Sequence, residues 1–186
     1  MGERELASTY PLKFEDIRDR FVERMPKGSA ILDFGCRSGR DTIFFTKKEL
    51  RVTPVESSKV LCNIATKNTG IRVRHMMYNE LRETGKYDGI WTSSAIHHLT
   101  YNQLVDVFAR ACRALKPNGI FYVSFNYGVF EGVRNGRNVT DMNEDKIKQV
   151  LGKVKGLVVE EMTLISDTRP DRGKQLWLHI FLRKND

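Results

Sequence analysis

The residues with the clearest chemical pattern are residues 30–41, which read Ala-Ile-Leu-Asp-Phe-Gly-Cys-Arg-Ser-Gly-Arg-Asp. A short apolar run ends at Asp33, as expected of a strand buried on both faces. Gly35 and Gly39 follow, and because glycine has no Cβ, a ligand can lie against bare main chain there. A helix that begins near Arg40 would point its free N–H groups at the same ligand. This strand, tight turn and helix predict a site for a nucleotide-type ligand.

The glycine spacing decides between kinds of nucleotide site. A dinucleotide fingerprint needs G-x-G-x-x-G, and Arg37 and Arg40 occupy its second and third glycine places. The chain has no G-x-x-x-x-G-K-[ST] phosphate loop. The pattern acidic-x-Gly-x-Gly-x-Gly fits better, since Asp33, Gly35 and Gly39 match it and Arg37 alone departs. The stretch therefore resembles motif I of the class I S-adenosylmethionine (SAM) dependent methyltransferases.

A second acidic residue supports a ribose-binding role. Residues 51–55 read as a strand, and Glu56 stands at its carboxyl end, about 20 residues after Gly35, where such folds place an acid on ribose hydroxyls. A solvated acid at a helix start is the alternative. Pro54 is unexpected inside a central strand, because it removes a ladder hydrogen bond. Either the strand pairs only after Pro54, or a bulge helps to deliver Glu56.

Length and composition set limits on the fold and the surroundings. The 186 residues suffice for one domain, 1–186, in which residues 1–12 are a flexible lead-in or a flap over the ligand. The chain has no apolar run long enough for a membrane span and no signal-peptide pattern, so we expect a cytoplasmic protein without membrane contact. The three cysteines show no paired spacing, which indicates reduced thiols.

The formal charge of +8 bears on the partner. A strongly basic chain invites a nucleic-acid partner. Lys and Arg are nevertheless scattered, with no run longer than two. We therefore favour a small-molecule substrate, which could be anionic, and keep nucleic acid as the alternative. The chain is expected to be a monomer or a homodimer.

Alternating apolar periodicity predicts an α/β fold. Helices are expected at 13–25, 41–50, 57–70, 100–115 and 141–151, and strands at 30–33, 51–55, 71–75, 86–94, 120–125, 157–166 and 176–182. Residues 116–119 read as a turn. Residues 126–139 read as a polar, glycine-rich functional loop.

This order of elements resembles the Rossmann-like class I methyltransferase fold, a mostly parallel seven-stranded sheet of order 3-2-1-4-5-7-6 with strand 7 antiparallel and helices on both faces. Stretches 87–91, 96–99, 115–119 and 124–128, with Arg169-Pro170 and 177–179, look like motifs of the small bacterial type 11 and tellurite-resistance-like group. The resemblance covers about residues 10–184. It is specific for the fold and for SAM, and unspecific for the methyl acceptor.

The resemblance implies a role for each residue that matches a motif. Asp33, Gly35, Cys36 and Gly39 would line the methionine part of SAM, and Glu56 would hold the ribose. The adenine would lie at Met77 and Tyr78, with Ser93 and Ser94 beneath the sulfonium. Arg37 must point away from the cofactor or reach toward its carboxylate.

The residues expected to bind the methyl acceptor match no specific motif. His97 and His98 follow the strand that abuts the first strand, so one of them is the candidate base for an acceptor that loses a proton. Tyr127, Glu131, Arg134 and Arg137 are candidates for binding the acceptor, with a solvated loop as the alternative. The four histidines show no metal-ligand spacing beyond the adjacent pair, and no metal is expected.

Three functions remain in view. The first is a methyltransferase that moves the SAM methyl group to a small molecule by in-line displacement. The second is the same enzyme acting on RNA or protein. The third is a SAM-binding subunit without catalysis, which the Arg37 departure motivates.

Overall fold

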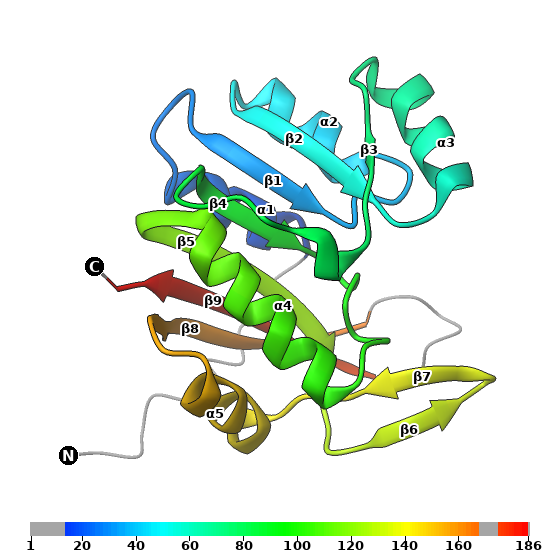
Figure 1. Cartoon of the computed structure of the whole chain (residues 1–186), viewed down its shortest axis with the longest axis vertical. Coiled ribbons are helices and arrows are strands. Elements are labelled where there is room, and N and C mark those ends of the chain that lie inside the picture. The colour runs from blue at the N-terminus through cyan, green and yellow to red at the C-terminus, as the bar shows by residue number, and fades with distance from the viewer. Residues whose placement is uncertain (1–13, 168–174, 186) are drawn as a thin grey trace.

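The computed structural model describes residues 14–167 and 175–185. These residues form a seven-stranded sheet with the order β3-β2-β1-β4-β5-β9-β8 (Figure 1). The five strands β3, β2, β1, β4 and β5 run parallel to one another, and β9 is antiparallel to both β5 and β8. The strands are β1 (Ala30–Phe34), β2 (Arg51–Glu56), β3 (Arg74–His75), β4 (Tyr87–Thr92), β5 (Leu115–Asn126), β8 (Leu157–Ser166) and β9 (Leu176–Lys184). The predicted order is confirmed, with β8 and β9 as the sixth and seventh strands of the sheet.

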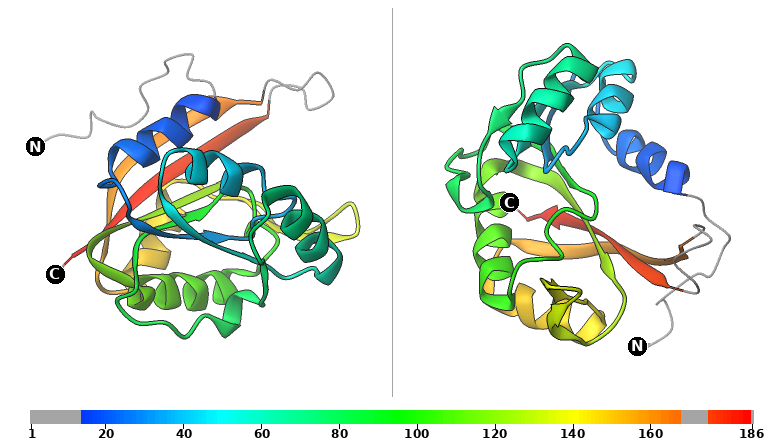
Figure 2. Two further views of the ribbon diagram at one scale, coloured as in Figure 1. Left: turned by 90° about the horizontal axis from the view of Figure 1, so that it is seen from above. Right: turned by 90° about the vertical axis from the view of Figure 1, so that its right-hand side faces the viewer.

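Helices cover both faces of the sheet (Figure 2). They are α1 (Phe14–Glu23), α2 (Arg40–Lys47), α3 (Lys59–Thr69), α4 (Tyr101–Ala114) and α5 (Glu144–Lys153), with a 3-10 turn η1 (Tyr78–Glu80). One apolar core lies between the sheet and α1 with α2, and a larger one lies between the sheet and α4 with α5. Helix α3 packs beside α2 against β2 and β3. No described helix has the length and hydropathy needed to cross a bilayer.

The boundaries of two strands differ clearly from those expected. Strand β3 is only two residues long, and β5 begins at Leu115 because Leu115 pairs with Tyr87 before pairing resumes between Gly89 and Ile120. The expected turn 116–119 is therefore an irregularity inside β5.

The polar segment 126–139 contains a β-hairpin, where a functional loop was expected. Strands β6 (Glu131–Arg134) and β7 (Arg137–Thr140) pair with each other and form a separate two-stranded sheet. The turn between them is Asn135-Gly136, with φ values of 52° and 74°. Asn-Gly favours this left-handed turn, which matches the twist of paired strands. The hairpin was thus readable from the dipeptide.

The unexpected Pro54 has a simple explanation. The carbonyl of Val55 faces β1, where it accepts from Gly35 N–H, and the carbonyl of Glu56 faces β3, where it accepts from Met76 N–H. Alternation along the strand turns the Pro54 nitrogen toward β3, which pairs with β2 only from Val55 onward. The strand pairs on that side only after Pro54, as one of the two alternatives predicted.

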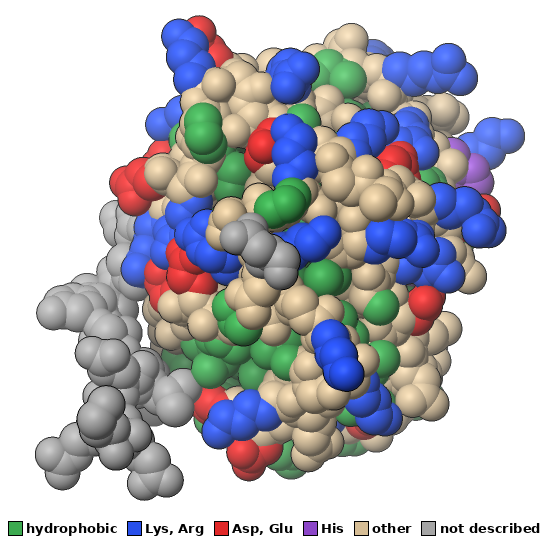
Figure 3. Space-filling view, turned by 60° about the vertical axis from the view of Figure 1, so that its left-hand side comes forward, with side chains coloured by type: hydrophobic (Ala, Val, Ile, Leu, Met, Phe, Trp, Pro, Cys, Tyr) green, Lys and Arg blue, Asp and Glu red, His purple; other side chains and the backbone are tan. Residues whose placement is uncertain are grey.

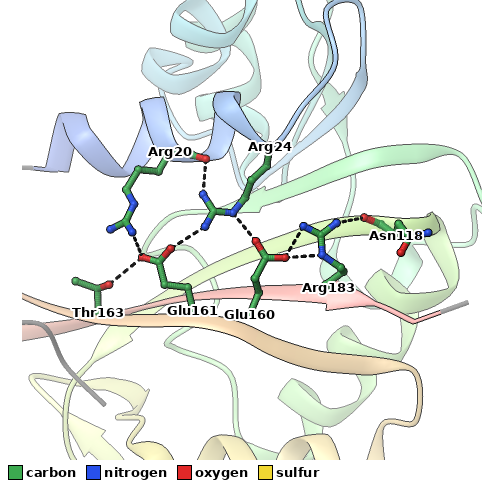
Figure 4. Close-up of polar contacts among 7 residues, drawn as sticks. All are labelled: Arg20, Arg24, Asn118, Glu160, Glu161, Thr163 and Arg183. Atoms are coloured by element: carbon green, nitrogen blue, oxygen red, sulfur yellow. Dashed lines mark hydrogen bonds and ion pairs between the residues drawn. The ribbon is translucent and has the colours of Figure 1, made fainter. Parts of the chain in front are cut away.

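An ion-pair network attaches α1 to the edge of the sheet (Figure 4). The register of β8 shifts between Val159 and Glu161, and the neighbouring Glu160 and Glu161 both reach α1. Arg24 donates to Glu160 at 2.8 Å and to Glu161 at 2.7 Å. Its guanidinium lies 4.4 Å from the ring centroid of Phe181. Because these groups are partly buried, the network has more effect than an exposed pair.

We expect Arg24→Ala to lower the free energy of unfolding by about 2 kcal/mol, since it removes the cation shared by two partly buried carboxylates and uncovers Phe181. Among the described residues, Glu161 then keeps only Arg20 as an ion-pair partner, and Glu160 keeps only Arg183. Urea titration at low and high salt measures the change, which should shrink in high salt. The control is Lys27→Ala, because Lys27 pairs with Glu49 and both side chains are well exposed, at 75% and 65%. It should change stability by less than about 0.5 kcal/mol. Equal losses in the two variants would contradict a special role for the α1 network.

Candidate active site

The predicted cofactor residues gather where three parallel strands end. Asp33 lies near the end of β1, Glu56 ends β2, and Ser93 and Ser94 follow β4. Tyr78 begins η1, which follows β3. Carboxyl ends of parallel strands at the point where the strand order reverses form the ligand crevice of open α/β sheets.

The two glycines of the loop allow close packing by protein groups. A Cβ on Gly35 would lie 2.6 Å from Ala95 Cβ and 2.7 Å from the Tyr78 hydroxyl. A Cβ on Gly39 would collide with the Thr69 methyl group of α3. On these sides the structure places protein against the glycines, where the sequence had suggested a ligand. Both have φ near +90°, which glycine adopts at little cost.

The main-chain N–H groups of the loop bind protein oxygens. Gly35 and Cys36 both donate to the Val55 carbonyl at 3.0 Å. The Arg37 N–H donates to Glu56 Oε2 at 2.9 Å, and the Ser58 N–H donates to Glu56 Oε1 at 2.9 Å. The buried Glu56 carboxylate thereby ties the loop after β1 to the start of α3.

Arg37 carries the backbone conformation of the glycine it replaces. Its φ is +54°, a left-handed value that costs a non-glycine residue about 1 kcal/mol. Its side chain is exposed. The Arg37 charge opposes the rise in the pKa of Tyr78 that burial causes, and it adds to the fall in the pKa of His97 that burial causes. The departure from the motif therefore keeps the loop geometry and adds a positive charge.

Asp33 is a buried carboxyl group with an unusual proton affinity. Burial raises its pKa to about 7, and the charges of Asp41 and Glu56 add to the rise. A hydrogen bond from the Thr42 hydroxyl, at 2.5 Å, opposes it. Asp41 in turn accepts from the Trp91 indole N–H at 3.0 Å. Three carboxylates thus converge beneath the loop, and Asp33 changes its charge near neutral pH. Burial also raises the pKa of the nearby Cys36, which remains a thiol.

Tyr78 and Met77 border a cavity of about 340 Å³. The buried Tyr78 ring packs edge-on against Phe34, and its hydroxyl donates to the Ala95 carbonyl at 2.9 Å. Met77 is half exposed, and its N–H donates to Glu80. The rest of the cavity wall comes from Asn79, Leu99 and the first two turns of α4. The cavity touches the predicted adenine residues and does not reach the glycine loop.

A polar row lies at the ends of β4, β5 and β9. Ser94, at a left-handed φ of 49°, donates its N–H to Ser124 Oγ at 2.8 Å. The Tyr122 hydroxyl lies 2.7 Å from His179 Nδ1. Burial lowers the pKa of His179 to about 4 and raises that of Tyr122, so the hydroxyl donates to a neutral imidazole. Ser93, which is partly exposed, interacts with the Tyr122 hydroxyl and lowers its pKa.

The two adjacent histidines have different surroundings. Burial lowers the pKa of both, so both are neutral at pH 7. His97 packs edge-on against Trp177 with 6.1 Å between ring centroids. The Ser94 main chain acts on the imidazole and opposes the lowering of its pKa, but the buried Nδ1 makes no hydrogen bond of normal geometry with a described residue. The exposed His98 lies 5.8 Å from the Tyr78 ring, and the Arg137 charge also lowers its pKa. Of the two candidate bases, His97 is thus the one with a buried ring nitrogen that lacks a hydrogen bond to the described residues.

Three of the four predicted acceptor-binding residues bind protein groups around the hairpin. The Tyr127 hydroxyl donates to Glu144 at 3.0 Å, and Glu131 accepts from the Tyr101 N–H at the start of α4. Arg134 pairs with Asp141 at 2.8 Å and covers the Phe130 ring. Arg137 is exposed, and its charge lowers the pKa of His98.

Comparison with known proteins agrees with this geometry. Residues 31–119 match the model of the methyltransferase domain family. An uncharacterized methyltransferase of Synechocystis is 28% identical over 96 residues, which are 50% of this chain and 45% of that protein. The chain thus spans less than half the length of this curated relative.

Solved structures extend the match to nearly the whole chain. The 1,6-didemethyltoxoflavin N1-methyltransferase of Burkholderia thailandensis, with its substrate and S-adenosylhomocysteine bound, superposes with a TM-score of 0.74 at 22% identity, over 92% of this chain and 77% of that one. A TehB-like SAM-dependent methyltransferase of Corynebacterium glutamicum gives 0.67 at 20% identity, over 90% and 87%. The fold is that of the class I SAM-dependent methyltransferases. The resemblance seen in the sequence is confirmed, and these findings support an enzyme that uses SAM.

Sequence analysis assigned no role to the polar residues at the end of β5. Ser124 and Asn126 are both buried. Ser124 and Asn126 alternate with Val123 and Phe125 in a strand that is otherwise apolar, and this pattern could have identified them as buried polar residues. Residues 1–12 and Arg169-Pro170, which were expected to contribute a flap and a motif, lie outside the described residues.

Asp33 gives a pH dependence with a definite sign. The folded state holds a proton on Asp33 up to about pH 7, and the unfolded state releases it near pH 3.8. The folded state binds more protons in this window, so the Asp33 contribution to the free energy of unfolding falls as pH rises from about 4 to 7, by up to about 1.4 kcal/mol per pH unit. Asp33→Asn should remove this fall and be more stable than the parent above pH 7.

Urea unfolding of the parent and of Asp33→Asn from pH 4 to 8 measures the difference in their free energies of unfolding at each pH. Because both proteins contain His179, its opposite slope cancels in this difference. The control is Asp19→Asn, since Asp19 lies exposed on α1 beside Lys48. A constant difference between Asp33→Asn and the parent across the range would show that Asp33 stays charged throughout.

Proposed function

We propose that this protein is a SAM-dependent methyltransferase that acts on a small molecule. The observation that carries the proposal is the buried Glu56 carboxylate, which the Arg37 and Ser58 N–H groups hold at the end of β2. A carboxylate fixed beside the glycine loop suits the ribose of a nucleoside-type ligand. The methyltransferase family match over residues 31–119 supports the same ligand.

The residues present fit SAM. A carboxylate has about four acceptor positions, and protein donors at Glu56 come from Arg37, Ser57 and Ser58, so capacity for a ribose hydroxyl remains. The Asp33 carboxylate beneath the loop, when ionised, can attract the ammonium group of the methionine part. The exposed Arg37 can approach the carboxylate of the same part. Met77 and Tyr78 offer apolar surface beside a cavity for the adenine.

SAM supplies an activated methyl group on a positively charged sulfur, so the protein mainly aligns an acceptor and excludes water. Ser93 and Ser94 follow β4 at the proposed transfer position. His97 can take the proton from an acceptor N–H or O–H, because its imidazole is neutral at pH 7 and its Nδ1 is unpartnered among the described residues. The His97 carbonyl accepts from the Thr140 N–H at 2.8 Å, which fixes the position of the backbone.

A small-molecule acceptor is favoured over a macromolecule. The Burkholderia structural neighbour is a 1,6-didemethyltoxoflavin N1-methyltransferase with 1,6-didemethyltoxoflavin bound. On the face drawn in Figure 3, Lys and Arg side chains are spread out with acidic side chains between several of them. Nucleic-acid binding is strongest where phosphates meet a continuous basic surface.

The first experiment is calorimetric titration with SAM and S-adenosylhomocysteine. We expect the parent to bind both, and Glu56→Gln to bind each about tenfold more weakly, because a charged acceptor for the ribose hydroxyls is lost. The control is Glu49→Gln, in an exposed pair with Lys27 distant from the loop. It should bind as the parent does.

Thermal unfolding of Glu56→Gln checks that the loop is intact. Failure of the parent to bind either compound would contradict the proposed function. Unchanged affinity in Glu56→Gln would overturn the ribose assignment and leave the rest of the proposal standing.

His97 predicts a pH profile for methyl transfer. A base must be deprotonated to work, and burial holds the pKa of His97 below 6.5, so the rate should be flat from pH 7 to 8 and fall in acid. His97→Gln should lower the rate by about 100-fold and remove this inflection. His75→Gln is the control, because His75 is exposed on β3. An unaltered inflection in His97→Gln would exclude His97 as the base.

A further inference from the structure

Asn126, the last residue of β5, holds an unexplained polar atom. The residue is 8% exposed, and no described residue donates a hydrogen bond to its Oδ1. Nearly all buried polar atoms in folded proteins have a partner, so an unpaired amide oxygen is costly unless a ligand or water satisfies it. The β5 strand is otherwise compatible with an apolar residue here, since it is buried throughout its second half.

A second unpaired atom lies nearby. His97 Nδ1 is buried and unpartnered among the described residues. Asn126 is directly opposite Trp177 in the β5–β9 register, and the Trp177 ring meets the His97 ring edge-on at 6.1 Å. Both unpaired residues therefore border the same indole.

The backbone confirms that the two residues are close. The Thr140 N–H donates to the His97 carbonyl at 2.8 Å, and the Met142 N–H donates to the Asn126 carbonyl at 2.9 Å. Thr140 and Met142 are two residues apart, which limits their separation to roughly 7 Å. One small molecule can therefore reach both side chains.

The chemistry of the two atoms restricts the ligand. Asn126 Oδ1 only accepts hydrogen bonds, so its partner must donate one. The neighbouring Ser124 Oγ is engaged by the Ser94 N–H. Trp177 and His97 provide aromatic surface, which suits a planar ligand.

We propose that Asn126 is a specificity-determining residue of the methyl-acceptor site, and that the acceptor is a planar molecule bearing an N–H or O–H group that donates to Asn126 Oδ1. A second N–H or O–H, the one to be methylated, faces His97 Nδ1. Its proton passes to Nδ1, the acceptor lone pair forms the new bond to the methyl carbon, and the carbon–sulfur electrons remain on sulfur. This inference rests on the proposed methyl transfer.

The test uses matched fragment pairs, with and without S-adenosylhomocysteine: indole against N-methylindole, 2-pyridone against N-methyl-2-pyridone, and phenol against methoxybenzene. Binding is followed by NMR through the indole N–H of Trp177, which lies opposite residue 126 and is present in every variant. We expect the donor-bearing member of at least one pair to bind at least tenfold more tightly than its methylated partner. Asn126→Leu should abolish this preference, and Asn126→Asp, which keeps an acceptor, should retain it.

The control is Asn138→Ala, an exposed residue of β7, which should bind the fragments as the parent does. Asn126→Leu should also raise the thermal midpoint, because it removes an unpaired buried group, whereas a residue kept for structure would lower it. Equal binding within every pair, no binding of any fragment, or a preference that survives Asn126→Leu would overturn the inference.

The two proposals can fail separately. Absence of S-adenosylhomocysteine binding contradicts the proposed function, and the fragment preference measured without it still decides the role of Asn126.

Discussion

The site depends on carboxylates placed out of water at the ends of β1 and β2. Glu56 is stabilised there by main-chain N–H groups, and in accepting them it fixes the loop that carries Gly35 and Arg37. Asp33 has only a hydroxyl partner and lies near two other acids, so it remains close to neutrality at physiological pH. The buried carboxylates therefore determine both the conformation of the loop and the charge of the site. A cationic ligand would stabilise the ionised form of Asp33 and lower its pKa.

This arrangement explains the tolerance for Arg37. A glycine at that position would relieve the left-handed backbone. The Arg37 N–H, however, is the donor to Glu56 whatever the side chain, so the essential contact survives the substitution. The exposed guanidinium adds positive charge to a site with three acids beneath it. The departure from the motif thus changes the electrostatics of the site more than its shape.

Sequence reasoning reached the parts that local patterns specify. The loop between β1 and α2 and the position of Glu56 follow from apolar periodicity and glycine spacing, which act over a few residues. The strand order followed from the resemblance to the class I methyltransferase fold. The roles of Tyr127, Glu131 and Arg134 did not follow, because their partners Glu144, Tyr101 and Asp141 come from other elements. The close packing of Tyr78 and Ala95 on Gly35 is likewise a contact between distant segments that no spacing rule encodes.

The contrast between His179 and His97 shows why the acceptor side needs the structure. Burial lowers the pKa of both imidazoles, so burial alone does not distinguish their roles. His179 has the Tyr122 hydroxyl on Nδ1, which fixes its tautomer and uses its basic nitrogen. His97 Nδ1 has no such partner among the described residues and faces the same wall as the unpaired Asn126 oxygen. Hydrogen-bond partners, more than residue type, therefore distinguish a structural histidine from one with a nitrogen free for chemistry, and they are the reason why we propose that the acceptor binds beside Trp177.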